Sequence, residues 1–165
     1  MRLPLIIGVG LLVSLSFNLP VLSQPNTTVQ IAQATLNNKL NLRLLKYNRS
    51  LWNSKNIFNY RYTLSNSCFC IPDARGPVII EVRNGQTVSI TSVATGQPAD
   101  PQFFQRYNTV PKLFDVIQDA IARRADSLNV SYNHRLGYPT QINIDYESQI
   151  ADEELFLTIE NFQKL

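Results

Sequence analysis

The chain has 165 residues, of which 44% are hydrophobic and 16% charged, with a formal net charge of +3. A chain of this length is the usual size of one domain and can bury a core without disulfides. The charge is too small to indicate nucleic acid or an anionic surface as the partner by itself. The sequence also has no phosphate-binding glycine loop and no array of arginine and aromatic residues suited to nucleic acid.

The N-terminus has the pattern of a secretory signal peptide. Arg2 precedes an uncharged apolar run over residues 5–13, and a small-residue exit follows at Val21-Leu22-Ser23. We therefore expect residues 1–23 to be removed and the protein to be periplasmic or secreted. The apolar run is interrupted by polar residues and is too short to span a bilayer, so we expect no membrane span after cleavage. A retained membrane anchor is the alternative.

Basic and acidic residues are distributed unevenly along the remaining chain. Residues 24–72 contain six basic residues and no acidic one, whereas residues 73–165 contain eight basic and twelve acidic residues. Such asymmetry has two interpretations. The simpler one is that the two parts complement each other inside one fold. The alternative is an exposed basic face for an acidic partner.

The first predicted element is a helix. Residues 24–33 are polar and predict a disordered leader, so the single domain is expected over residues 34–165. Apolar residues then recur at spacings of four, four, three and four, which places them on one stripe of a helix: Leu36, Leu40, Leu44, Tyr47 and Leu51. Beside them runs a basic stripe of Lys39, Arg43 and Lys46. We expect the apolar stripe to face the core. The alternative is a basic amphipathic helix that meets a membrane or a partner.

Three strands are predicted next. Alternating residues over 58–64 indicate a strand with one buried face. Two runs rich in β-branched residues, 78–83 and 87–93, flank Asn84-Gly85, the residue pair typical of a tight hairpin. Residues 96–104 carry Pro98 and Pro101 and predict a loop.

The second half repeats this order. A helix is expected to start at a cap on Asn108 or Thr109, with Pro111 in its first turn, and to end near Arg124. Strands follow over residues 128–132, 142–146 and 155–159. The predicted fold is α+β, with two helices packed on one face of a mainly antiparallel sheet of about six strands in the order α-βββ-α-βββ.

Several separated motifs carry a resemblance to a known family. They are Tyr60-x-Tyr62-x-Leu64-x-x-x-Cys68-x-Cys70, Gly76-Pro77-Val78 and Leu136-Gly137-Tyr138-Pro139-Thr140-x-Ile142-x-Ile144-Asp145, followed by Ala151-Asp152-Glu153. With them the chain resembles an uncharacterised, domain-of-unknown-function family of exported bacterial proteins, over residues 52–162. The resemblance implies a location in the bacterial cell envelope and no known activity.

Cys68 and Cys70 are the two cysteines of the chain. An oxidising compartment permits a disulfide between them. Residues two apart in a regular strand have Cα atoms about 6.6 Å apart and Cβ atoms too distant for a bond, so a bridge requires a bulge or turn here. We expect a local structural disulfide. Free or intermolecular thiols, a redox role and metal binding are the alternatives.

Two further groups of side chains are candidates for chemistry. Asp145, Asp152 and Glu153 are acidic residues that predict a weak calcium site, although a solvated polar surface is the simpler interpretation. His134 is the single histidine, and the sequence has no nucleophile-elbow motif for a Ser-His-Asp triad. We therefore expect no enzyme and no cofactor.

These observations predict an exported, non-catalytic binding or structural module of the cell envelope. Its partner would be an envelope protein or a ligand that the sequence does not identify. An exposed apolar patch would suit such a role, and Phe103, Phe104 and Tyr138 are the candidates for it. The alternative function is a thiol-disulfide redox protein or other enzyme centred on Cys68 and Cys70.

Overall fold

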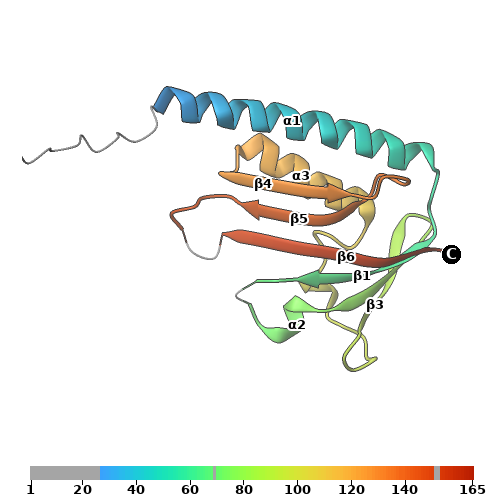
Figure 1. Ribbon diagram of the computed structural model, residues 1–165. Coiled ribbons are helices and arrows are strands. Elements are labelled where there is room, and N and C mark those ends of the chain that lie inside the picture. The colour runs from blue at the N-terminus through green and yellow to red at the C-terminus, as the bar shows by residue number, and fades with distance from the viewer. Residues whose placement is uncertain (1–26, 69, 151–152) are drawn as a thin grey trace, which may run out of the picture.

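The computed structural model describes residues 27–68, 70–150 and 153–165, and side chains from residue 33 onward (Figure 1). The predicted signal peptide therefore lies outside the described residues. In chain order the elements are α1 (Thr27–Ser54), β1 (Tyr60–Asn66), α2 (Pro72–Arg75), β2 (Val78–Arg83), β3 (Gln86–Ser92), the 3-10 helix η1 (Pro101–Phe103), α3 (Val110–Arg123), β4 (Ser127–Tyr132), β5 (Pro139–Asp145) and β6 (Glu154–Lys164).

The strands form one open sheet of six strands in the order β3-β2-β1-β6-β5-β4. Every neighbouring pair is antiparallel. This confirms the predicted α+β class. The short helices α2 and η1 are additions to the predicted order, and both lie in connections that contain proline.

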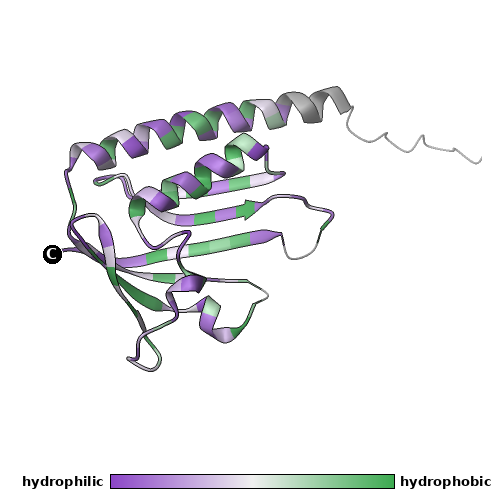
Figure 2. Ribbon diagram, turned by 180° about the vertical axis from the view of Figure 1, so that it is seen from behind, coloured by the Kyte–Doolittle hydropathy of each residue, from purple (hydrophilic) through white to green (hydrophobic). Residues whose placement is uncertain are grey.

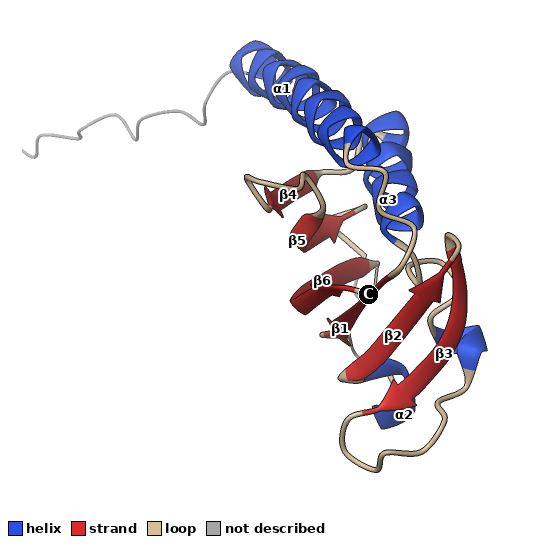
Figure 3. Ribbon diagram, turned by 90° about the vertical axis from the view of Figure 1, so that its right-hand side faces the viewer, coloured by secondary structure: helices blue, strands red, loops and turns tan. Residues whose placement is uncertain are grey.

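The core lies on one face of this sheet, because side chains alternate between its two faces. In β1, Tyr60, Tyr62 and Leu64 are buried whereas Arg61 is exposed. The sheet curves, and α3 lies inside the curve against the buried face (Figure 3). Apolar residues of α3 fill the space between: Val110, Leu113, Phe114, Val116, Ile117 and Ala120.

Local chemistry explains where α3 begins and ends. The Thr109 side chain accepts a hydrogen bond from the Lys112 backbone N–H, which is the predicted N-cap, and proline occupies the first turn. Arg124 adopts a left-handed conformation with φ of 57°, and its N–H donates to carbonyls in the last turn. The helix therefore ends at Arg123.

The Asn84-Gly85 hairpin has the predicted geometry. Both residues have positive φ, 50° and 76°, and Arg83 pairs with Gln86 across the turn. The tip is also tied to the connection between α1 and β1, because Asn84 N–H donates to Asn59 Oδ1 at 2.8 Å and Gly85 N–H donates to Phe58 O at 2.9 Å.

Helix α1 differs from the prediction in its start and its position. It begins at Thr27, so residues 27–33, which were expected to be a disordered leader, are helical. It contacts α3 and β4, and it lies beside α3 at the β4 end of the sheet (Figure 3). Of the two long helices, α3 is thus the one packed on the face of the sheet. None of the helices in the described part of the chain is long and apolar enough to cross a membrane.

Candidate functional site

Helix α1 has a buried face that the apolar stripe did not predict. Its members recur at spacings of three, four, three and four residues: Asn38, Asn41, Leu45, Asn48 and Trp52. Leu45, Asn48 and Trp52 are buried, and Asn38 and Asn41 are half-buried. We call these five residues the inner face of α1.

Amide hydrogen bonds fix the inner face to the rest of the fold. Asn38 Nδ2 donates to the carbonyl of Ile121 at the end of α3, at 3.2 Å, and Asn41 Nδ2 donates to the carbonyl of Leu128 in β4, at 3.1 Å. The Ile121 carbonyl also accepts from the Arg124 N–H, whereas Leu128 lies in an edge strand, where a carbonyl that faces away from the sheet needs a partner from elsewhere. The asparagines therefore bury one side of α1 without an apolar residue at each position.

Trp52 anchors the C-terminal end of α1. Its ring packs edge-on against Tyr60, Tyr138 and Phe162, with centroids 5.4, 6.3 and 5.7 Å away. The turn between β4 and β5 closes over the same region at Gly137, which has φ of 83°. A Cβ at Gly137 would overlap the carbonyl oxygen of Asn48, so the turn and the helix pack backbone against backbone.

The opposite face of α1 carries the predicted apolar stripe, and it is exposed. Leu36, Leu40, Leu44 and Tyr47 are 64%, 54%, 39% and 67% exposed. With 3.6 residues per turn, Leu36, Leu40 and Tyr47 lie about 140–180° around the helix from Leu45, and Leu44 lies about 100° from it. The prediction that this stripe faces the core is therefore wrong. We call these four residues the outer stripe; Leu51, the fifth predicted member, is half-buried.

Apolar residues recur along the whole described length of α1, as the green bands in Figure 2 show. They belong to both faces, so the helix has no single apolar side. When a helix has apolar residues on two sides, either both sides pack against other elements or one side is exposed to solvent. In α1 the inner face is already packed, which leaves the outer stripe without a partner among the described residues.

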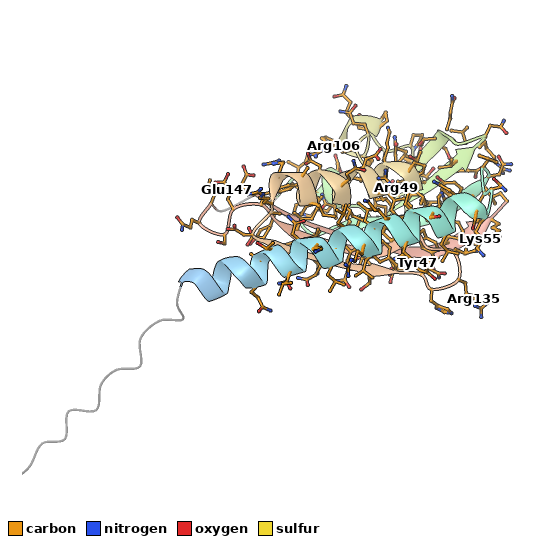
Figure 4. All side chains as sticks on the ribbon, turned by 90° about the horizontal axis from the view of Figure 1, so that it is seen from above. Tyr47, Arg49, Lys55, Arg106, Arg135 and Glu147 are labelled. Carbon is orange, nitrogen blue, oxygen red and sulfur yellow. A yellow bond between two sulfur atoms is a disulfide. The ribbon has the colours of Figure 1, made fainter. Side chains whose placement is uncertain are left out.

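Basic side chains lie beside the outer stripe. Lys39, Arg43 and Lys46 are exposed, and none of them forms an ion pair with another described residue. Arg49 differs, because it projects toward α3 (Figure 4), where it pairs with Asp115 at 3.0 Å and lies over the Phe114 ring. The first three cations are therefore free to meet a partner together with the outer stripe.

The predicted aromatic patch is wrong. Phe104 is 0% exposed and Tyr138 is 7% exposed, and Phe103 is half-buried against the same core. The loop over residues 96–104 is bonded to β3, because Ala99 N–H donates to the Ile90 carbonyl at 2.9 Å, and η1 then leads Phe103 and Phe104 into the core. Tyr138 instead stacks on Phe162 at 4.4 Å beneath Trp52.

The cysteines lie at the other end of β1 from Trp52. Cys68 and Cys70 form a disulfide, with Cα atoms 5.2 Å apart, and both are half-buried; Phe69 between them lies outside the described residues. They line an open hollow of about 560 Å³ together with residues of β1, β6 and the α2 segment. Arg75 and Glu154 are the charged residues among this described lining, and Arg75 Nε donates to the Cys70 carbonyl at 2.9 Å.

The predicted acidic site is only partly in view. Asp152 lies outside the described residues, Asp145 is half-buried on β5, and Glu153 is exposed and 4.0 Å from Arg123. Within the described parts of the chain, no three His, Cys, Asp or Glu residues gather closely enough to hold a metal ion. His134 is exposed in the turn between β4 and β5.

Buried tyrosines form ties within the core. Burial raises the pKa of Tyr60 to about 12, and Tyr60 Oη accepts a hydrogen bond from the Val110 N–H at the start of α3. Burial also raises the pKa of Tyr62, whose hydroxyl donates to the Tyr107 carbonyl at 2.9 Å. Both hydroxyls therefore stay protonated at neutral pH and hold the segment before α3 against β1.

Comparison with known proteins identifies a family but no characterised relative. A family model described as "Family of unknown function (DUF6174)" matches residues 44–164. No curated protein and no solved structure matches the chain. The matched residues include the C-terminal part of α1, Trp52 and all six strands. Because this match extends over more than half of the sequence, the chain belongs to DUF6174, a family of unknown function.

Proposed function

We propose that this protein is an exported, non-catalytic binding module of the cell envelope that makes contact through the outer stripe of α1. The observation that carries the proposal is the exposure of four apolar side chains on one side of a helix whose other side is packed. A contiguous patch of exposed apolar residues marks an interaction site more often than apolar residues scattered singly over a surface do.

The packing of α1 gives the outer stripe a fixed shape. Hydrogen bonds from Asn38 and Asn41, and the burial of Leu45 and Trp52, hold the helix at several points along its length. A helix held in this way cannot rotate to bury the outer stripe without breaking those contacts. The outer stripe is therefore a preformed surface, and binding does not require the helix to be ordered first.

Export is supported by the sequence, in which residues 1–23 have the pattern of a signal peptide. A non-catalytic role is supported by the separation of the side chains best suited to catalysis. His134 lies in the turn beside the Trp52 end of β1, whereas Cys68 and Cys70 follow its other end. A positioned acid, base and nucleophile would need to converge.

The test uses the chain from residue 24 to 165, which contains every described element and the whole core. Purified protein is mixed with isolated envelopes of a bacterial host, and the fraction retained after washing is measured. The outer-stripe variant carries Leu36→Gln, Leu40→Gln and Tyr47→Gln. Glutamine keeps helix propensity close to that of leucine, so α1 should stay helical.

We expect the wild type to be retained and the outer-stripe variant to be washed off. Val88→Gln is the matched control, because Val88 is 57% exposed but lies on β3; it should be retained like the wild type. Equal retention of the outer-stripe variant and the wild type would refute the proposal.

A redox role is the second candidate, favoured by the position of the Cys68–Cys70 disulfide at an open hollow that a thiol can enter. Under that role the protein would catalyse thiol-disulfide exchange, for example reduction of insulin disulfides by added dithiothreitol, which would be oxidised while the Cys68–Cys70 pair cycles between dithiol and disulfide. The proposal of a binding module predicts no turnover above that of the Cys68→Ser/Cys70→Ser variant. Turnover that this variant abolishes would establish the redox role instead.

A further inference from the structure

We infer that the outer stripe of α1, together with its basic neighbours, binds the surface of an anionic lipid bilayer. This inference rests on the proposed function and names the partner of the same surface. The helix would lie in the plane of the membrane, with Leu36, Leu40 and Tyr47 among the acyl chains and head groups. Helices of this kind combine an apolar stripe with lysine and arginine on the adjacent surface.

The charge of α1 fits this partner. The helix contains no aspartate or glutamate, and Lys39, Arg43 and Lys46 flank the outer stripe on one side. Long basic side chains can lay their methylene groups along the apolar stripe and keep their charged ends at the level of the head groups. Each one near an anionic membrane strengthens binding by roughly fivefold.

The shape and place of α1 also fit a flat surface. The helix lies along the outside of the molecule, with the sheet and α3 on its other side, so its outer side is a convex ridge (Figure 1 and Figure 3). A ridge can meet a bilayer along its whole length. Tyr47 is the most exposed member of the outer stripe, at 67%, and tyrosine is enriched at membrane interfaces.

A second copy of the chain fits the same surface less well. Antiparallel pairing of two outer stripes would bring Lys39, Arg43 and Lys46 of each copy toward those of the other, and like charges repel. The outer stripe also consists of four residues, whereas a stable protein interface uses about 20–30 residues on each side. The observations therefore favour lipid over self-association.

The order of the chain brings α1 close to a bilayer. The apolar segment that predicts export ends at Ser23, and α1 starts at Thr27. The first described element after that segment is α1. If the segment is retained in the membrane, it holds the outer stripe beside the bilayer surface at high effective concentration.

The experiment measures co-flotation of residues 24–165 with vesicles, because the N-terminal apolar segment would bind lipid on its own account. One set of vesicles contains phosphatidylcholine and phosphatidylglycerol, and the other contains phosphatidylcholine alone. Four proteins are compared: the wild type, the outer-stripe variant, a basic variant with Lys39→Gln, Arg43→Gln and Lys46→Gln, and the Val88→Gln control. Circular dichroism verifies that each is folded.

We expect the wild type and Val88→Gln to float with the anionic vesicles, and both other variants to lose about 10-fold or more in partitioning. On neutral vesicles the wild type should bind no better than the basic variant. Flotation of all four proteins alike, or of none while folded, would overturn the inference.

Two further outcomes would also overturn it, and the first of them leaves the proposed function intact. If the wild type is retained on envelopes but does not float with anionic vesicles, and the outer-stripe variant is not retained, the partner is an envelope protein. If the wild type forms a dimer in sedimentation that the outer-stripe variant abolishes, the outer stripe binds a second copy.

Discussion

Helices α1 and α3 pack against each other, but their buried faces differ in composition. In α3 the buried face is apolar, and the exposed face carries residues such as Lys112, Gln118 and Arg123. In α1 the buried face is rich in asparagine, and leucines and a tyrosine point outward. Burial of apolar side chains stabilises the packing of α3. In α1, hydrogen bonds to the backbone carbonyl oxygens of Ile121 and Leu128 contribute as well.

The difference follows from where each helix sits. Helix α3 covers the face of the sheet, where side chains meet other side chains. Helix α1 covers the end of α3 and the edge strand β4, where backbone carbonyls accept hydrogen bonds from its asparagine side chains. At this edge position asparagine side chains can therefore form the buried face of α1, and the apolar residues of the outer stripe remain exposed.

The largest effect should come from the anchor of the inner face. Trp52→Ala removes a buried ring that contacts Tyr60, Tyr138 and Phe162, and should lower the free energy of unfolding by about 3–5 kcal/mol. Ile117→Ala in the buried face of α3 should cost about 2–5 kcal/mol. Denaturant titration of both variants compares the two helices directly. A cost below 1 kcal/mol for Trp52→Ala would mean that α1 is not part of the cooperative fold.

The close approach of the β4–β5 turn to α1 gives the next effect. Gly137→Ala combines a positive φ with overlap against the backbone of α1 and should cost about 2 kcal/mol or more. Gly96→Ala is the control, because Gly96 also has positive φ but a Cβ there meets nothing within 4 Å; it should cost about 1 kcal/mol. Equal losses in the two denaturation midpoints would argue against the contact between this turn and α1.

A smaller effect should follow from the loss of one amide. Asn41→Ala leaves the Leu128 carbonyl without its donor and should cost about 1–2 kcal/mol. Asn37→Ala, at an exposed position of the same helix, should change the free energy of unfolding by less than about 0.5 kcal/mol. If thermal unfolding shows the two variants to be alike, asparagine does not hold the inner face in place.

The smallest effect is expected on the outer stripe. Leu40→Gln changes an exposed side chain and should alter the free energy of unfolding by no more than about 0.5 kcal/mol. Leu45→Gln, five residues away on the inner face, buries an amide in place of an apolar side chain and should cost about 3 kcal/mol or more. Substantial destabilisation by Leu40→Gln in a denaturant titration would show that the outer stripe is packed within the fold.

The same two helices show which features of the fold the sequence predicts and which it does not. The spacing of Leu36, Leu40 and Leu44 predicts a helix correctly, because periodicity reports which residues share a face. Periodicity does not report which face meets the core. In α3 the cap, the proline and the apolar stripe all agree. In α1 two sets of residues have helical spacing, and hydrophobicity favours the outer stripe as the buried one.

A signal for the inner face was present in the sequence. The spacing of three and four residues from Asn38 to the single tryptophan is as regular as that of the leucines. It was missed because asparagine is normally exposed, and its burial depends on carbonyls supplied by residues more than 80 positions away, such as Ile121. The inward turn of Phe104 and Tyr138 was missed for a similar reason, since loop positions say little about tertiary contacts.

The most direct test of the outer stripe as a contact surface places an environment-sensitive fluorophore on it. The dye is attached to Leu40→Cys in residues 24–165, and to Val88→Cys as the reference, with the Cys68–Cys70 disulfide left oxidised. Emission is recorded before and after addition of isolated envelopes. The account predicts a blue shift at position 40 and none at position 88. No shift at position 40, or equal shifts at both positions, would contradict it.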